Sequence, residues 1–143
     1  MSGIVRLVTD TARPKHVDMF YYANTALDLA DGELVEIDLT STTYGLGKTV
    51  VQSTTTASLC PGVTDRAVDA SVVSPLWIPI VTQGVKDGCK TASLSAKDDV
   101  GQSGSAAGTL TDASTDAGSA LGKALNTDDE IWFFGLYRCT APA

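Results

Sequence analysis

The chain has 143 residues, 43% of them hydrophobic, so its size and composition fit a single folded domain with a buried core. Its 17 Asp and Glu residues outnumber its ten Lys and Arg residues, and the cations are spread singly, which argues against the concentrated basic surface that binds nucleic acid. No stretch approaches the roughly 18 apolar residues of a membrane span, and the N-terminal sequence lacks the apolar stretch of a secretory signal, so we expect no membrane partner and folding in a cytoplasm.

The N-terminal residues 1–25 are predicted to form an extended arm, followed by a β domain over residues 26–143. A strand-like run at residues 4–8 is separated from the rest by a polar stretch whose Pro14 would interrupt a continuous strand. Such an arm can pair with an exposed sheet edge of a neighbouring molecule. The alternative is that it completes the sheet of its own domain. The predicted intermolecular contact residues are Ile4, Val5, Leu7, Met19, Phe20, Tyr21 and Tyr22.

The clearest strand signal lies at residues 33–39, where Val35, Ile37 and Leu39 alternate with other residues after an Asp-Gly turn. This alternation predicts a half-buried strand with one apolar face. Pro79 cannot donate a ladder hydrogen bond, so its strand is expected at a sheet edge or with a bulge at the proline. The further predicted strands, rich in β-branched or aromatic residues, are 49–53, 67–73, 76–82 and 131–138.

Helical periodicity is scarce along the chain. The best candidate is residues 112–125, but Gly118 and Gly122 each cost about 1 kcal/mol relative to Ala in a helix interior, so we expect one or two turns at most. Residues 97–108 have the composition of an exposed loop. Two Asp-Gly turns, at residues 31–32 and 87–88, begin weakly similar units. The predicted fold is all-β, a small barrel or sandwich of short antiparallel strands.

Two clusters hold six of the nine aromatic residues (Phe 3, Tyr 4, Trp 2), at residues 20–22 and 132–134. Consecutive side chains of a strand point to opposite faces. One side of each cluster is therefore predicted to fill the core while the other meets a partner. The alternative is that both faces are buried within one protomer.

The stretch YGLGKTV at residues 44–50 ends like a phosphate-binding loop. That loop requires a glycine five positions before Gly47, where this chain has Thr42, and a helix after Lys48, where residues 49–53 are predicted to form a strand. The GKT sequence is therefore predicted to be a hairpin turn, and the similar GKAL at Gly122 is interpreted in the same way. No nucleotide or other cofactor is expected.

No catalytic or metal-binding residue is predicted. The chain has a single histidine, so a histidine cluster for a metal is impossible and a catalytic triad would rest on this one residue, which is expected at a solvated surface position. The three cysteines have no short paired spacing and are interpreted as free, buried or partly buried thiols. Adjacent acids are interpreted as solvated charge. The residues concerned are His16, Cys60, Cys89, Cys139, Asp98, Asp99, Asp128 and Asp129.

Five segments together resemble a known family. In chain order they are DGELVEIDL, LCPGVTDRAV, WIPIVTQGV, KDGCKTASL and SALGKALNTDDEIWFFGLYR. Their order and spacing are similar to those of small all-β capsid decoration, or cement, proteins of tailed bacteriophages. The resemblance covers roughly residues 26–139, and the aromatic N-terminal segment departs from the usual pattern.

This resemblance implies a non-enzymatic structural protein that acts on the virion. Such proteins bind the major capsid protein on the outside of the shell, often as trimers, and stabilise it against the pressure of packaged DNA. The expected partners are thus the major capsid protein and further copies of this chain. The alternatives are another virion interaction module, such as a head-fibre or tail component, or a carbohydrate-binding β-sandwich. An enzyme is a third reading, weakly supported by His16 and Cys60.

Overall fold

The structure is a computed structural model that describes residues 14–24, 26–56, 58–72, 76–113, 120–135 and 138–140. These residues form eleven strands, and no helix occurs among them, which confirms the all-β prediction. The strands are β1 (Lys15–Tyr22), β2 (Leu34–Ile37), β3 (Thr49–Gln52), β4 (Ser58–Cys60), β5 (Gly62–Thr64), β6 (Leu76–Lys86), β7 (Asp99–Gln102), β8 (Leu110–Asp112), β9 (Gly122–Ala124), β10 (Ile131–Phe134) and β11 (Arg138–Thr140).

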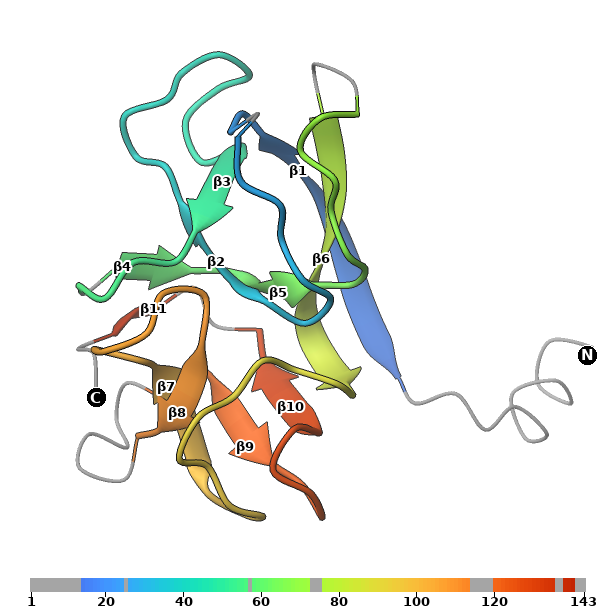
Figure 1. Ribbon diagram of the computed structural model, residues 1–143, viewed down its shortest axis with the longest axis vertical. Coiled ribbons are helices and arrows are strands. Elements are labelled where there is room, and N and C mark those ends of the chain that lie inside the picture. The colour runs from blue at the N-terminus through green and yellow to red at the C-terminus, as the bar shows by residue number, and fades with distance from the viewer. Residues whose placement is uncertain are drawn as a thin grey trace, which may run out of the picture.

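Five strands close into a small barrel, in the upper part of Figure 1. Their order is β1-β3-β2-β5-β6, and β6 pairs back to β1. Four of these pairings are antiparallel, whereas β1 and β3 are parallel. Gly62 allows the close approach of β5 to β6, because a Cβ at this position would stand 1.9 Å from the carbonyl oxygen of Val81. The barrel closure therefore depends on a position without a side chain.

The second half of the molecule extends from the same sheet. Strand β6 leaves the barrel and pairs with β10, which continues to β9, β7 and β8 in the lower part of Figure 1. Strands β4 and β11 form a separate antiparallel pair. Because β6 belongs to both halves, it fixes their relative position.

Two hydrophobic cores result from this arrangement. The barrel core contains Phe20, Tyr22, Leu29, Val35, Ile37, Val50, Val68, Ala70, Ile78 and Ile80. The second core lies between the barrel wall and the second half and contains Leu34, Cys60, Val63, Val81, Cys89, Leu94, Val100, Leu110, Leu121, Ala124, Ile131 and Phe133. Strand β2 is thus apolar on both faces, because Leu34 enters one core and Val35 and Ile37 enter the other. The prediction of a strand with one apolar face was therefore incomplete, because the second face of β2 is also buried at Leu34.

The two Asp-Gly turns lie against each other at the junction of the halves. The Lys90 amide donates to the Gly32 carbonyl over 2.9 Å, and a Cβ on Gly32 would stand 2.5 Å from the Gly88 carbonyl oxygen. Beside this contact the Lys90 amine donates to Glu33 Oε1 over 2.8 Å, and the Glu33 side chain is only 4% exposed. Glu33 Oε2 has no hydrogen-bond partner among the described residues. Lys90 is therefore the cation that neutralises a buried carboxylate at this junction.

Strand β6 corrects the prediction made from Pro79. It is a central strand, and its irregularity lies opposite His16 and Val17, where Thr82 is the additional residue, and not at the proline. The Pro79 carbonyl accepts from the Asp65 amide over 3.0 Å, just beyond the end of β5. The missing N–H of Pro79 points to the same side of the strand, where β5 has ended, so no strand partner loses a donor.

Three other local predictions were wrong. Within residues 67–73 only Val68 is paired, in an isolated bridge with Leu29, and residue 73 lies outside the described residues. Strand β7 lies within the predicted loop 97–108. In the predicted helix 112–125, Asp112 ends β8 and Gly122–Ala124 forms β9, so GKAL is strand rather than turn. Residues 114–119 lie outside the described residues.

Candidate interaction surface

The GKT sequence lies in the hairpin loop between β2 and β3, as predicted. The Gly45 amide donates to the Thr42 carbonyl and the Lys48 amide to the Gly45 carbonyl, over 3.1 and 3.3 Å. Strand β3 begins at Thr49, directly after Lys48. No helix N-terminus is present here to bind a phosphate.

The side chains with reactive chemistry are dispersed. Within the described residues, no group of three or more His, Cys, Asp and Glu side chains is placed to hold a metal ion. His16 is exposed, as expected, and its Nε2 lies 3.0 Å from Asp18 Oδ1. Burial raises the pKa of the Cys89 thiol to about 12, so this thiol is protonated at neutral pH and is a poor nucleophile.

The predicted contact residues fall into three groups. Ile4, Val5 and Leu7 lie outside the described residues. Strand β1 places Phe20 and Tyr22 in the barrel core, where the Tyr22 hydroxyl donates to the Leu27 carbonyl over 2.7 Å. Met19 and Tyr21 face outward. Residues 15–22 thus complete the barrel of their own chain, which was the alternative arrangement, and Met19 and Tyr21 remain as contact candidates among the described residues.

The outward side chains of β1 continue into an exposed apolar surface that we call the aromatic patch. It consists of Met19, Tyr21, Tyr44, Leu46 and Trp77. The ring centroids lie 4.7 Å apart for Tyr21 and Tyr44, 5.0 Å for Tyr44 and Trp77, and 5.9 Å for Tyr21 and Trp77. Tyr21 and Tyr44 pack edge to face, with an interplanar angle of 65°, whereas the two pairs that include Trp77 are tilted, at 56° and 59°.

The patch is assembled from three distant parts of the chain. Tyr21 lies on β1 and Trp77 opposite it on β6, and Tyr44 and Leu46 belong to the β2–β3 loop. This loop is held over β1 by the Tyr21 amide, which donates to the Lys48 carbonyl over 2.8 Å. At the start of the loop, hydrogen bonds from Thr40 hold the pKa of Asp38 below its ordinary value. The loop therefore has a defined conformation at both ends.

The exposed fractions show that the patch is open to a partner. Leu46 is 67% exposed, Met19 54%, Tyr44 41% and Trp77 37%. A hollow of about 410 Å³ adjoins it, lined in part by Met19, Leu46 and Lys48. Apolar surface of this kind, rich in Tyr and Trp, is typical of the energetic centre of protein interfaces.

The ring distances exclude an aromatic cage for a cationic ligand. In such a cage the cation lies over ring faces within about 6 Å of the centroids. Here the rings contact one another at 4.7–5.9 Å, so no space for a methylated ammonium group remains between them. The three rings therefore form a continuous surface and not a cage.

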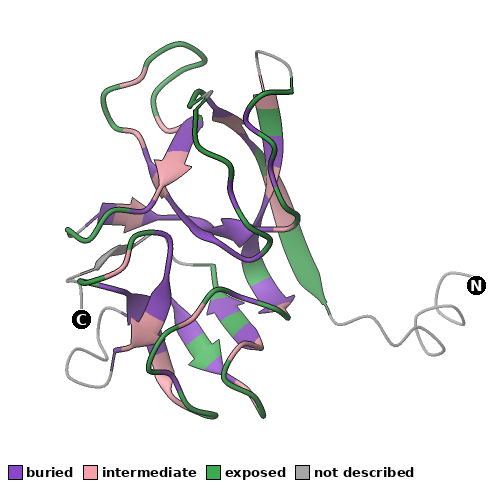
Figure 2. Cartoon of the chain, viewed as in Figure 1, coloured by how far each residue is buried: buried purple, intermediate pink, exposed green. Residues whose placement is uncertain are grey.

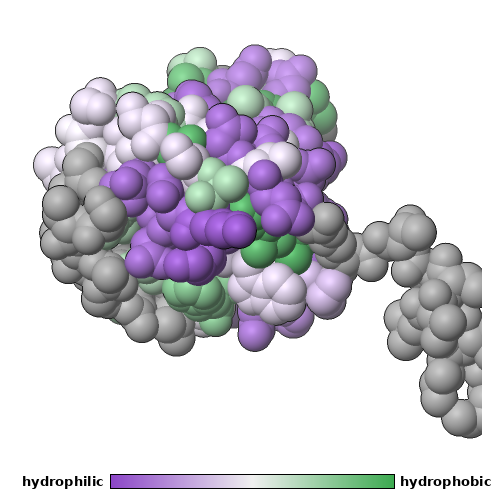
Figure 3. Space-filling model, turned by 90° about the horizontal axis from the view of Figure 1, so that it is seen from below, coloured by the Kyte–Doolittle hydropathy of each residue, from purple (hydrophilic) through white to green (hydrophobic). Residues whose placement is uncertain are grey.

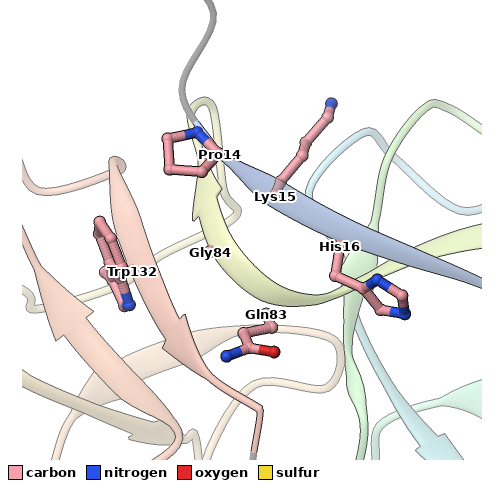
Figure 4. Close-up of a pocket in the computed structure, with 6 residues that line it drawn as sticks. All are labelled: Pro14, Lys15, His16, Gln83, Gly84 and Trp132. Carbon is pink, nitrogen blue, oxygen red and sulfur yellow. The ribbon is translucent and has the colours of Figure 1, made fainter. Parts of the chain in front are cut away.

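A second exposed aromatic pair lies on β10, in the other half of the molecule. Figure 2 shows the alternation of buried and exposed residues along the lower strands, and in β10 it leaves Ile131 and Phe133 buried and Trp132 and Phe134 exposed. This confirms the prediction that one side of the C-terminal aromatic cluster fills the core, and contact of the other side with a partner stays a prediction. Figure 3, which views the molecule from below, shows a band of hydrophilic residues across the centre of this face with hydrophobic residues beside it. Beside Trp132 lies a hollow of about 220 Å³, shown in Figure 4 and lined by Pro14, Lys15, His16, Gln83, Gly84 and Trp132.

Sequence reasoning missed three members of the aromatic patch, Tyr44, Leu46 and Trp77. Tyr44 and Leu46 lie in the loop that was considered only for phosphate binding. The outward position of Trp77 could have been predicted from the alternation along its strand. Ile78 and Ile80 lie on the buried side, and Trp77 and Pro79 lie on the other side. The contact between Tyr21, Tyr44 and Trp77 had no signal, because the three residues are far apart in the sequence.

The described part of the chain has no helix of the length and apolar character that crossing a membrane requires. Comparison with known proteins identified no matching family model, no matching curated protein and no matching solved structure.

Proposed function

We propose that this protein is a non-enzymatic structural protein of a tailed-phage virion, which decorates the outer surface of the capsid and binds the major capsid protein through the aromatic patch. The observation that carries the proposal is the exposed cluster of Tyr21, Tyr44 and Trp77 on the barrel wall. The resemblance of residues 26–139 to capsid decoration proteins supplies the identity of the partner.

The geometry of the cluster favours binding of another protein. The three rings already pack against one another, so a partner that covers them would immobilise few additional side-chain rotamers. Two of the rings lie on β1 and β6, which pair over eight residues and form a rigid support. A preorganised apolar centre of this kind carries most of the binding free energy in measured interfaces.

The proposal includes self-association on the shell, most simply as the trimer that the resemblance implies. Ile4, Val5 and Leu7 remain proposed contact residues of this assembly, together with Met19 and Tyr21. The net charge of −7 favours solubility of the free protein.

Co-sedimentation of the purified chain with capsids tests the proposal. The capsids come from the phage whose genome encodes this protein and are prepared without it. We expect saturable binding of the purified chain, and a loss of about 30-fold in affinity for Trp77→Ala, which corresponds to a hot-spot contribution of about 2 kcal/mol. The matched control is Trp132→Ala, which removes the other exposed tryptophan and should bind within about threefold of the wild type. Absence of wild-type binding, or equal loss in both variants, would contradict the proposal.

A further inference from the structure

The hollow beside Trp132 has a different chemistry from the aromatic patch. Trp132 is 43% exposed and stands on the outer face of β10. In Figure 4 the Gln83 amide lies between the Trp132 indole and the His16 imidazole, while the Lys15 side chain extends away from them. In the strand register Gln83 of β6 is paired with His16 of β1 and with Phe134 of β10. Trp132 lies two residues before Phe134 on the same exposed face of β10.

The polar groups at the hollow are suited to hydroxyl groups. The Gln83 amide at the hollow offers donors and an acceptor. His16 adds an imidazole whose orientation is fixed by Asp18, which also accepts from the Thr82 hydroxyl over 3.0 Å. Amide and imidazole groups next to an indole face can bind a ligand that has hydroxyl groups on its edge and C–H groups on its face.

The charges around the hollow select against an anionic ligand. The Lys15 amine is 2.7 Å from Asp65 Oδ1. On the neighbouring strand β9, the Lys123 amine is 3.2 Å from Asp99 Oδ1, beside Trp132 in the register. Both nearby amines are thus neutralised by carboxylates, so a phosphate or a nucleic acid would find no unpaired cation among these described residues.

The size of the hollow also restricts the ligand. Its volume of about 220 Å³ is below the roughly 300–1,000 Å³ of sites that enclose drug-sized molecules. One pyranose ring is the kind of unit that fits, whereas an extended peptide needs a longer groove.

From these observations we propose that the Trp132 hollow binds a neutral saccharide unit. The sugar stacks its C–H face on the Trp132 indole, and its hydroxyl groups exchange hydrogen bonds with Gln83 and His16. This site is separate from the aromatic patch, and the proposal holds whether or not the protein binds a capsid.

Binding is tested first on a glycan array with the labelled full chain, and then by fluorescence titration of the Trp77→Phe variant, in which Trp132 is the remaining tryptophan of the two. The titration probes are methyl glycosides of glucose, galactose, mannose and N-acetylglucosamine, together with any glycan that binds on the array. We expect saturable binding with a Kd on the order of 1 mM for a single sugar.

Variants then assign the site. Trp132→Ala should abolish array binding, and Gln83→Ala should weaken it about tenfold, the equivalent of one or two hydrogen bonds. Trp77→Ala should bind glycans as the wild type does, although it is the variant expected to lose capsid binding. Circular dichroism controls the fold of each variant, and Gln83→Ala remains informative if Trp132→Ala does not fold. Absence of any saturable glycan binding, binding that survives Trp132→Ala, or capture of peptides alone would overturn the proposal.

Discussion

Two N-terminal truncations test whether β1 is part of the barrel. Deletion of residues 2–13 leaves β1 intact, whereas deletion of residues 2–22 removes it. The longer deletion removes Phe20 and Tyr22, which are 6% and 2% exposed. Truncation of a buried aromatic side chain costs about 3–5 kcal/mol, so the two together cost about 6–10 kcal/mol, comparable to the whole stability of about 5–15 kcal/mol of a small domain.

The backbone contributes to the same result. Without β1, strand β6 loses a partner along eight residues and β3 loses its parallel neighbour, so the barrel opens on both sides of the gap. We expect the protein that lacks residues 2–22 to be unfolded in water. The protein that lacks residues 2–13 should have a free energy of unfolding within about 1 kcal/mol of that of the full chain. The assay is urea unfolding followed by circular dichroism. A 2–22 deletion that unfolds cooperatively at the wild-type midpoint would refute the barrel arrangement described here.

Three further predictions concern single side chains. Gly62→Ala should destabilise the protein by about 3 kcal/mol, because the new Cβ would overlap a backbone carbonyl. Gly88→Ala is the control and should cost about 1 kcal/mol, because Gly88 has a φ of +74° but open space around it. Equal urea midpoints for the two variants would contradict this prediction. Lys90→Met should lower the free energy of unfolding by about 2 kcal/mol, since it leaves the buried Glu33 carboxylate unpaired while Lys90 itself is partly exposed. The control is the more exposed pair of Lys123 and Asp99, where Lys123→Met should change the free energy of unfolding by less than about 0.5 kcal/mol. The Cys89 thiol should remain unmodified by Ellman's reagent at pH 8 in the folded protein, as measured by peptide mass spectrometry, and rapid modification under native conditions would count against its burial.

The sequence predicted those strands whose pattern is local. Residues 33–39 contain β2 because β-branched side chains alternate there, and the strand ends at Ile37 because the Asp38 side chain accepts from Thr40 in a turn. Leu39 is consequently exposed, although its place in the alternation suggested burial. Alternation within the two aromatic clusters was predictable for the same reason, since neighbouring strand residues face opposite sides.

Strands β7 and β9 could not be predicted from local composition. Their segments are rich in small residues and glycine, and their extended conformation results from pairing with each other and with β8 and β10. Val100, for example, is fully buried by strands that lie elsewhere in the sequence. Strand propensity depends on such neighbours more than helix propensity does.

The aromatic patch depends on long-range contacts in the same way. Its loop residues reach Tyr21 only because β1 and β3 pair in parallel, a pairing that joins segments about thirty residues apart. The aromatic residues are visible in the sequence, but nothing in the sequence pattern indicates that they lie close together in the fold. The exposed position of Trp77 follows from the pairing of Tyr21 with Trp77 across β1 and β6.

Hydroxyl-radical footprinting of the capsid-bound protein tests the central claim most directly. Oxidation of each aromatic and methionine side chain is measured by mass spectrometry in the free protein and on saturated capsids. The proposed function predicts strong protection of Met19, Tyr44 and Trp77 on binding, and unchanged oxidation of Trp132, which lies outside the patch. Protection of Trp132 with no change at Trp77 and Tyr44 would contradict the claim that the aromatic patch is the capsid-binding surface.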